Sequence, residues 1–410
     1  MTMAADKQDK VLNVPTLRFP EFKGEWNDYR LRDLCTFHSG GTPSIDNVEY
    51  WEGEIPFVSA VAMHNTHIEK TPLTLTEKGL RNGSKQLEAG NLLLLVRGSM
   101  LWNKIPICYN DVDVAFNQDV KGIVPNSKTT SLFLLNWIQS HENRIKYMVT
   151  GTGIGAGKLD SEDLLALNVK LPSLNEQKKI EKFLSLIDER IETQIRIINK
   201  LQSLMKGLND YLQDSVPLSY SLSFSDIGED YSGLSGKSAE DFRSGKPYIT
   251  YVSIYANNFV EDDCCGKVSV ERGEKQNVVQ KGDMLFTLSS ETPEEVCYGA
   301  VYSGNSTETY LNSFCFGVRN TEEKVFSPYM AYFFNSSRFR REVYPLAQGS
   351  TRFNLQKSDF LQKQFSYPSI ENQHRIFEIL NAYDNKIKVE NKILAHYQLQ
   401  KDFLLRNLFI

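Results

Sequence analysis

Residues 172–213 read PSLNEQKKIEKFLSLIDERIETQIRIINKLQSLMKGLNDYLQ, and this stretch decides the fold of the 410-residue chain. Its apolar residues recur at alternating intervals of four and three, which is the spacing of one face of an α-helix. The seam consists of Ile180, Leu184, Ile187, Ile191, Ile198, Leu201, Met205, Leu208 and Leu212, with one polar interruption at Gln194. Ser173 and Glu176 have the spacing of a capping box. At about 1.5 Å per residue the helix is about 60 Å long, and such a seam needs a partner helix.

The partner is a copy of the same helix later in the chain. A shift of 196 residues carries Pro172-Ser173 onto Pro368-Ser369 and Gln177 onto Gln373. The second seam consists of Ile376, Leu380, Ile387, Leu394, Leu404 and Leu408. We therefore expect two long helices that pack against each other as a coiled coil.

Polar residues interrupt both seams at the same place, Gln194 in the first helix and Glu390 in the second. In an antiparallel pair these two residues are expected to lie close together near mid-length. One interpretation is that they fix the register, because slipped alignments leave their polar groups without partners. The alternative is that the seam is simply hydrated there.

A globular segment precedes each helix, and the two segments repeat each other in outline. Gly90-Asn91 before Leu92–Val96 predicts a turn and a buried strand, and Gly282-Asp283 before Met284–Phe286 repeats it at an offset of 192. Two further pairs of segments match between the two globular parts. Ile55–Ser59 matches Ile249–Ser253, and both are predicted to be strands. Residues 131–148 match residues 329–344, and each stretch is predicted to be a single amphipathic helix.

The sequence thus predicts a protein built as a tandem duplication of about 200 residues. Its predicted parts are a flexible N-terminal lead at 1–22, a globular domain at 23–171, a long helix at 172–214, a second globular domain at 215–367 and a second long helix at 368–410. The offset stays at 196 through the helices but drifts within the domains. The helices are therefore expected to match in length.

Composition and charge narrow the class of protein. The longest aliphatic run, Leu92–Val96, is too short to span a membrane, and the first ten residues lack a signal-peptide core. The six cysteines form no C-x-x-C pair, so we expect free thiols and a cytoplasmic location. The net charge of −5 counts against a protein that coats nucleic acid, but not against DNA binding by local patches.

We find no catalytic or metal-binding pattern in the sequence. The glycine-rich stretch Thr150–Lys158 departs from the P-loop because Gly157-Lys158 precedes leucine, and it follows a helix rather than a strand. A flexible connector is favoured there, with contact to a DNA backbone as a second possibility. His64 and His67 have no companion ligands. The motifs of amino-methyltransferases and helicases are absent, so we expect neither a metal nor a cofactor.

What remains is recognition of DNA by basic side chains and polar loops, since arginine reads guanine or holds phosphate. The candidates in the first half are Ser39, Gly40, Gly41, Thr42, Arg97, Lys104, Arg144 and Lys158. Those in the second half are Lys246, Arg338, Arg340, Arg341, Ser350 and Arg352. Arg144 and Arg340 are expected at equivalent positions. The alternative for each candidate is a solvated charge or an ordinary turn.

On these features the sequence resembles the specificity subunit of type I restriction-modification systems, over nearly the whole chain. The resemblance rests on Leu17–Phe22 followed by Trp26, and on the two helix boundaries, LPSLNEQ at 171–177 and YPSIENQ at 367–373. The family pattern P-x-x-x-E-Q is intact in the first boundary. In the second boundary Asn372 replaces the glutamate.

The resemblance implies two target-recognition domains, each a mixed α/β unit that reads one half of a bipartite site in double-stranded DNA. It also implies that the two long helices pack antiparallel with pseudo-twofold symmetry and set the spacing between the half-sites. It implies docking of two methyltransferase subunits and two restriction-translocation subunits. S-adenosylmethionine, ATP and magnesium then belong to those partners, and this chain is not catalytic. Two alternatives remain, a stand-alone DNA methyltransferase or nuclease, and a coiled-coil scaffold without DNA specificity.

Overall fold

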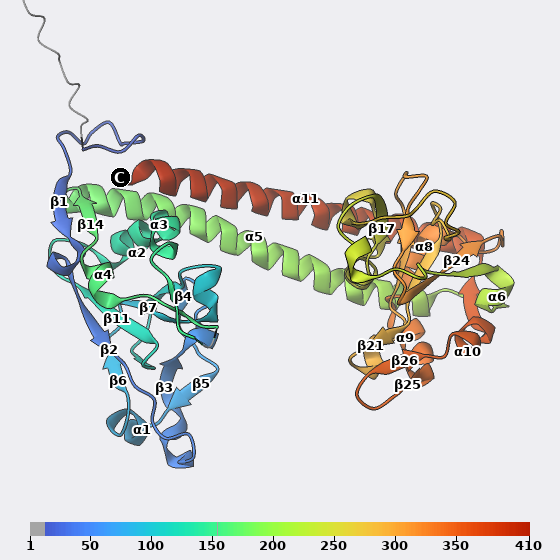
Figure 1. Cartoon of the computed structure of the whole chain (residues 1–410), viewed down its shortest axis with the longest axis horizontal. Helices are drawn as coiled ribbons and strands as arrows, with labels where there is room; N and C mark the ends of the chain where they lie inside the picture. The colour runs from blue at the N-terminus through green and yellow to red at the C-terminus, as the bar shows by residue number, and fades with distance from the viewer. Residues whose placement is uncertain (1–12, 154) are drawn as a thin grey trace, which may run out of the picture. The chain divides into compact units, whose positions relative to one another are not determined.

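A computed structural model of the chain describes residues 13–153 and 155–410 (Figure 1). Two compact units are present, one made of the chain up to Gln194 together with Ile393–Ile410, the other of Ile195–Lys392. Each unit contains an α/β domain and one half of each long helix. The first twelve residues of the expected lead lie outside the described residues.

The first unit is built on a five-stranded sheet with neighbouring smaller sheets. The order of the large sheet is β2 (Cys35–Ser39), β11 (Val120–Pro125), β7 (Leu92–Leu95), β9 (Ile107–Asn110) and β4 (His67–Ile68). A four-stranded sheet has the order β5 (Leu73–Leu75), β3 (Trp51–Val58), β10 (Val114–Phe116) and β6 (Lys85–Leu87). A three-stranded sheet has the order β12 (Thr150–Gly151), β13 (Gly157–Lys158) and β8 (Arg97–Gly98). A two-stranded sheet pairs β1 (Asn27–Arg30) with β14 (Asn168–Leu171). All four leucines of β7 are buried, as their apolar run predicts.

The second unit repeats this topology. Its large sheet has the order β16 (Gly228–Ser232), β24 (Cys315–Asn320), β20 (Met284–Thr287), β22 (Gly299–Tyr302) and β18 (Phe259–Val260). One three-stranded sheet has the order β19 (Cys265–Val268), β17 (Lys246–Ile249) and β23 (Tyr310–Leu311). Another has the order β21 (Ser289–Ser290), β26 (Phe353–Leu355) and β25 (Ala347–Gln348). A two-stranded sheet pairs β15 (Leu218–Leu222) with β27 (Phe365–Pro368). The same pairs of strands are parallel in both units, β4 with β9 and β18 with β22, which supports the duplication.

The helices of the domains are short. The first unit contains α1 (Glu77–Arg81), α2 (Ser131–Ser140), α3 (Glu142–Lys146) and α4 (Ser161–Leu165). The second contains α6 (Phe224–Ile227), α7 (Tyr251–Ala256), α8 (Ser327–Phe333), α9 (Ser337–Val343) and α10 (Lys357–Gln362).

Three local predictions were wrong. The amphipathic stretches 131–148 and 329–344 each form two helices, broken near His141 and near Ser336, whose side chain accepts a hydrogen bond as the N-cap of α9. The glycine-rich connector is the hairpin β12–β13, because its second strand pairs with β8. The predicted strand at Ile249–Ser253 ends at Ile249, since Thr250 caps helix α7.

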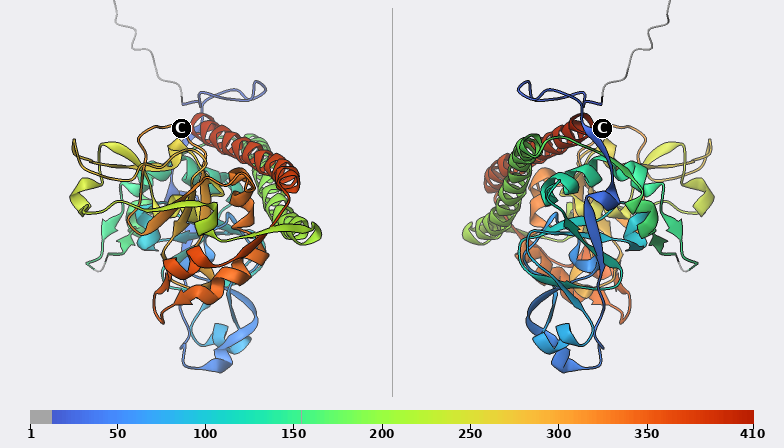
Figure 2. Two further views of the ribbon diagram at one scale, coloured as in Figure 1. Left: turned by 90° about the vertical axis from the view of Figure 1, so that its right-hand side faces the viewer. Right: turned by 90° about the vertical axis from the view of Figure 1, so that its left-hand side faces the viewer.

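The two long helices, α5 (Leu174–Ser215) and α11 (Ile370–Leu408), are 42 and 39 residues long. In each unit a half of α5, in green, lies beside a half of α11, in red (Figure 1, Figure 2). Lys401 near the end of α11 pairs with Asp188 near the start of α5, at 2.6 Å. In the other unit the start of α11 and the end of α5 share one apolar cluster. The helices therefore run antiparallel, as predicted.

Most seam positions are buried as the heptad predicts. The buried apolar ones are Ile180, Leu184, Ile187, Ile198, Ile376, Leu380, Ile387, Leu404 and Leu408, while Ile191, Leu201, Met205, Leu208, Leu212 and Leu394 are half-buried. Gln194 and Glu390 are buried too, and Glu390 forms an ion pair with Lys386. Their role in fixing the register stays a prediction.

A buried glutamine ties each long helix to its domain. Gln177 donates hydrogen bonds to the carbonyl oxygens of Pro172 and Lys128, both at 3.0 Å, and its amide oxygen accepts from Thr129 Oγ1 at 3.1 Å. Gln373 repeats the arrangement with the carbonyl oxygens of Pro368 and Lys324, at 3.0 and 2.8 Å. Both glutamines are fully buried. This is the physical reason for a glutamine at each helix boundary.

Replacing Gln177 with methionine is expected to lower the free energy of unfolding by about 3 kcal/mol. The substitution keeps the side-chain length but removes hydrogen bonds to two carbonyl oxygens and from one hydroxyl, at about 1–3 kcal/mol for each buried group left unpaired. Urea unfolding measures the change. Gln202→Met, at an exposed position on the same helix, is the control and should stay within about 0.5 kcal/mol. Equal effects of both substitutions would contradict the anchoring role.

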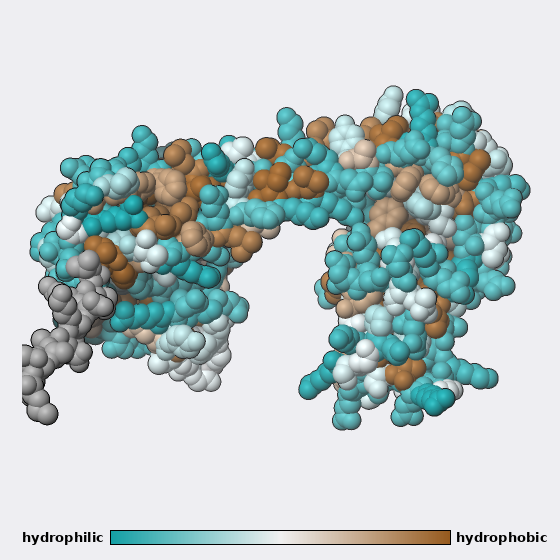
Figure 3. All heavy atoms as spheres, turned by 90° about the horizontal axis from the view of Figure 1, so that it is seen from above, coloured by the Kyte–Doolittle hydropathy of each residue, from teal (hydrophilic) through white to brown (hydrophobic). Residues whose placement is uncertain are grey.

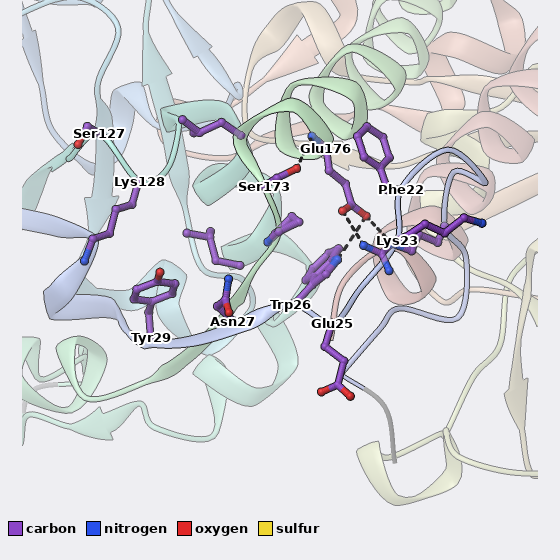
Figure 4. A pocket seen from close by; sticks show the side chains of 14 residues that line it. Phe22, Lys23, Glu25, Trp26, Asn27, Tyr29, Ser127, Lys128, Ser173 and Glu176 are labelled. Atoms are coloured by element: carbon purple, nitrogen blue, oxygen red, sulfur yellow. Dashed lines mark hydrogen bonds and ion pairs between the residues drawn. The ribbon is translucent and has the colours of Figure 1, made fainter. Parts of the chain in front are cut away.

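The capping box at Ser173 forms only in part. The Glu176 backbone N–H bonds Ser173 Oγ at 3.4 Å, but the Glu176 carboxylate turns away from the helix start (Figure 4). It accepts two hydrogen bonds from Arg18, both at 2.8 Å, and one from Trp26 Nε1 at 3.3 Å. Residues 13–22, expected to belong to a flexible lead, are thus held by a partly buried ion pair. The hollow beside it has a volume of about 460 Å³.

Glu181 makes the stability of this junction depend on pH. It is half-buried beside Thr130, whose hydroxyl donates to the carboxylate, and burial raises its pKa to about 7 from an ordinary value of 4.5. Between these values the unfolded chain has lost the proton that the folded chain retains, so stability falls as the pH rises through this window.

Glu181→Gln is therefore expected to stabilise the protein at pH 8 relative to pH 5. The gain should be about 1 kcal/mol, because partial exposure reduces the effect of the full pKa shift. Thermal unfolding at the two pH values measures it. Glu189→Gln, at an exposed position of the same helix, should show no such difference. A gain for Glu181→Gln that is larger at pH 5 would show that the sign is wrong.

Candidate functional site

In the first unit the polar loop after β2 is fixed against a turn that joins β10 to β11. Gly41 N–H bonds the Phe116 carbonyl oxygen at 2.9 Å, and Thr42 Oγ1 donates to Gln118 Oε1 at 2.8 Å. At Gly40, a Cβ atom would stand 2.1 Å from the Phe116 oxygen, so only glycine fits. Lys121 Nζ donates to Ser39 Oγ at 2.6 Å. The predicted loop Ser39–Thr42 is thus a defined surface.

That turn is closed by Asn117, whose Oδ1 accepts from the Asp119 N–H at 3.1 Å. The Asp119 carbonyl accepts from the backbone N–H groups of Val96 and Arg97 at 2.8 and 3.3 Å. The Arg97 side chain lies 4.0 Å from the Asp119 carboxylate and is about half exposed. Lys158 stands opposite Arg97 in the β8–β13 pair and 3.7 Å from Asp160.

The structure therefore brings six predicted residues onto one surface with the turn at 117–119. We call this surface turn face 1, and it consists of Ser39, Gly40, Gly41, Thr42, Arg97, Asn117, Gln118, Asp119 and Lys158. Two cations, one carboxylate and several amide and hydroxyl groups meet there.

The second unit contains the same turn with different side chains. Asn312 Oδ1 accepts from the Phe314 N–H at 2.9 Å, and the Phe314 carbonyl accepts from the Leu288 N–H at 2.9 Å. A Cβ atom at Gly233 would meet the Asn312 oxygen at 2.0 Å, so glycine is required here too. Phe314 stands where Asp119 stands in the first unit and is 56% exposed.

Arg352 completes this second surface. Its guanidinium lies 5.8 Å from the centre of the Phe314 ring, and it belongs to the loop between β25 and β26. We define turn face 2 as Gly233, Asn312–Phe314, Ser350 and Arg352; Ser350 is an exposed residue of the same loop. Neither turn was predicted from the sequence. The signal was an apolar strand followed by asparagine, at Phe116-Asn117 and Leu311-Asn312, 195 residues apart.

Other predicted residues lie elsewhere. Lys104 belongs to a loop held by helix α3, where Glu142 accepts from the Ile105 N–H at 2.7 Å and Lys146 donates to the Asn103 carbonyl at 2.8 Å. Arg144 is exposed on that helix. In the second unit Lys246 lies on β17 and pairs with Glu308 at 2.7 Å. Arg338 donates to the Ser366 carbonyl at 2.8 Å, and Arg341 is exposed.

Arg340 is not available to DNA in this arrangement. Its guanidinium donates to the carbonyl oxygens of Glu294, Val296 and Cys297 at 2.7, 2.5 and 2.9 Å. Burial lowers the pKa of this guanidinium. Arg144 and Arg340 lie on corresponding helices, α3 and α9, as expected, but their surroundings differ because Arg144 is exposed.

Within residues 13–153 and 155–410, no three His, Cys, Asp or Glu side chains are grouped so as to hold a metal ion. Crossing a bilayer would need a longer apolar helix than any in the described part of the chain. The chemistry of the two turn faces is that of hydrogen bonding, charge and apolar contact. These are the means by which proteins read base edges.

Known proteins that resemble this chain belong to one family. The model of the family described as type I restriction modification DNA specificity domain matches residues 23–203 and 225–396. The EcoR124I/EcoR124II specificity subunit from Escherichia coli is 29% identical over 184 residues, which are 44% of this chain and 45% of that protein. The MjaVIII specificity subunit from Methanocaldococcus jannaschii is 25% identical over 94% of this chain and 92% of that protein.

Two solved structures share the fold. The type I restriction-modification S subunit from M. genitalium superposes with a TM-score of 0.52 at 16% identity, over 97% of this chain and 99% of that one. A chain from a study of complex assembly and conformational transition of the type I R-M system superposes with a TM-score of 0.54 at 13% identity, over 94% and 97%. At these identities the likeness concerns the fold alone.

Proposed function

The chain belongs to the type I restriction modification DNA specificity family, and we propose that it is the non-catalytic subunit that selects the DNA target of a type I restriction-modification complex. The observation that carries the proposal is the pair of turn faces. One backbone scaffold occurs twice, and it presents Arg97 with Asp119 in one unit and Arg352 with Phe314 in the other. Two similar domains with different reading surfaces suit a target made of two different halves.

The side chains favour contacts to bases as well as to the DNA backbone. Arginine reads guanine through two hydrogen bonds, aspartate accepts from the cytosine amino group, and an aromatic ring contacts the thymine methyl. Arg97, Asp119 and Lys158 are proposed to contact the first half-site, and Phe314, Ser350 and Arg352 the second. Lys104, Arg144 and Lys246 are proposed as contacts to phosphate, where their charge matters more than their geometry.

The proposed recognition domains are residues 23–171 and 215–367, with the long helices as the spacer between half-sites. We propose that two methyltransferase subunits and two restriction-translocation subunits dock on this chain, bringing S-adenosylmethionine, ATP and magnesium. Exposed apolar side chains on the helices support a docking role, because such patches commonly mark protein interfaces. They include Leu399 and Phe403 on α11 and Leu204 and Tyr211 on α5, and Figure 3 shows brown patches along the helices.

Selection of random DNA duplexes by the subunit in complex with its methyltransferase partner tests the proposal. The enriched duplexes should share two short defined elements separated by a spacer of fixed length and free sequence. A scaffold without DNA specificity predicts no enriched sequence. A stand-alone enzyme predicts that the purified chain binds S-adenosylmethionine in a calorimetric titration or cleaves DNA by itself.

A further inference from the structure

The loop between β21 and β22, Glu291–Cys297, is held by one arginine in a way that the rest of the second unit does not repeat. Arg340 reaches it from helix α9 and donates to three carbonyl oxygens of the loop. Its guanidinium also lies 4.8 Å from the centre of the Tyr298 ring. Only a planar group with several fixed N–H donors can bind three carbonyls and stack on a ring at once.

The backbone of this loop is strained where the arginine holds it. Cys297 has a φ of +56° although it is not glycine, and its side chain is fully buried. Such a conformation is energetically unfavourable for a residue other than glycine and persists only where its surroundings enforce it. The Arg340 hydrogen bond to the Cys297 carbonyl supplies part of that enforcement.

Two tyrosines of helix α7 hold the same segment from the other side. Tyr255 donates to the Glu295 carboxylate at 2.6 Å, and its ring lies 4.7 Å from that of Tyr298. Tyr251 donates to the Ser289 carbonyl at 2.7 Å. The segment is therefore fixed at both ends and in the middle, although it has the composition of an exposed acidic loop.

This segment supports the hairpin of turn face 2. The strand that precedes it, β21, pairs with β26, with Ser290 opposite Phe353. The 3-10 turn within it, Pro293–Glu295, packs against β25. Arg352 lies between β25 and β26. A shift of the loop would therefore move the hairpin that places Arg352 beside Phe314.

The first unit holds the corresponding loop with different chemistry. There Glu142 and Lys146 of α3 bind the backbone at Ile105 and Asn103. In both units the second short helix thus fixes the loop next to the hairpin through charged side chains. The same loop is fixed in both units, but by unrelated residues. This indicates that the position of the loop is required, whereas the identity of the side chain that fixes it is not.

We propose that Arg340 is a positioning residue for recognition of the second half-site, acting through loop Glu291–Cys297 on the hairpin that carries Arg352. This inference rests on the proposed function and deepens it, because Arg340 acts without touching DNA. Its effect is specific to one half of the target. A residue with only a general structural role would affect both halves.

The test uses the full chain in complex with its methyltransferase partner and two duplex libraries, each randomised in one half-site with the other half-site fixed. Arg340→Lys keeps the charge but loses the fork and the stacking. Discrimination against single mismatches in the second half-site is expected to fall about tenfold, which is within the range that one mismatched pair contributes. Discrimination in the first half-site should stay unchanged.

Two control variants match this substitution. Arg341→Lys changes the exposed neighbour on the same helix, and Arg190→Lys changes an exposed arginine on α5. Both should leave discrimination in both half-sites within twofold of the unmodified complex. Arg340→Lys with unchanged discrimination in the second half-site would overturn the proposal, and so would an equal loss in both halves.

A second variant covers the case in which Arg340→Lys folds poorly. In the double variant Arg340→Lys, Cys297→Gly, glycine adopts the positive φ without enforcement, which removes the strain. The proposal expects relaxed selection in the second half-site here too, and intact selection in this folded variant would overturn it. If the unmodified complex enriches no bipartite sequence, the proposed function fails, an outcome distinct from failure of the positioning role alone.

Discussion

Deleting one heptad from each long helix, residues 191–197 and 387–393, is expected to shorten the spacer of the DNA target by about three base pairs. Seven residues at about 1.5 Å each remove about 10 Å of helix, and the B-DNA repeat is about 3.4 Å per base pair. Both half-site sequences should stay the same, because the domains are untouched. Selection from random duplexes by the complex measures spacer and half-sites together.

The control is deletion of the same heptad from one helix only. The two helices run antiparallel in each unit, so a single deletion leaves one seam seven residues shorter than its partner. We expect this variant to be destabilised and to select no defined target. Altered half-sites with an unchanged spacer in the double deletion would falsify the role of the helices as a spacer.

Exchanging residues 23–170 for the first domain of another family member should change the first half-site completely and leave the second half-site unchanged. The turn that carries Asp119 and the strand that carries Arg97 both move with the exchanged domain, whereas turn face 2 is retained. The reciprocal exchange of the second domain, residues 216–366, should change only the second half-site. The same duplex selection measures both, with the unchanged half-site as an internal control.

An exchange variant that selects no DNA sequence at all has to be checked for correct folding. The new domain must be able to form the hydrogen bonds that Gln177 makes at the start of the long helix. Thr129 and Lys128 contact that glutamine and lie inside the exchanged range. A donor domain with its own intact boundary motif keeps this contact. Changes in both half-sites of a folded, active exchange variant would contradict the separation of the two readings.

The long helices were predicted from the regular spacing of their apolar residues, and the duplication was predicted from the repeat of that spacing 196 residues later. Every fourth or third residue from Ile180 to Ile187 is buried, and the boundary residues Gln177 and Gln373 have matching partners. These features depend on spacing along one element. A sequence shows such spacing directly, so the two long helices and their approximate lengths could be predicted, while their antiparallel orientation came from the family resemblance.

Features that depend on distant partners could not be predicted in the same way. The Thr150–Lys158 stretch forms a hairpin because it pairs with Arg97-Gly98, more than fifty residues earlier in the chain. The Arg340 side chain points inward because its guanidinium donates hydrogen bonds to the carbonyl oxygens of Glu294, Val296 and Cys297. Turn face 1 was predicted in part, through its loop and its two cations. The turn at Asn117, which unites them, was not predicted.

The most direct test of two independent readings is a map of N6-methylated adenines in the genome of a cell that carries this subunit and its methyltransferase partner. The proposed function predicts one bipartite motif, with two unlike half-sites, a methylated adenine in each and a spacer of fixed length. A single continuous motif, or methylation that does not depend on the subunit, would contradict it.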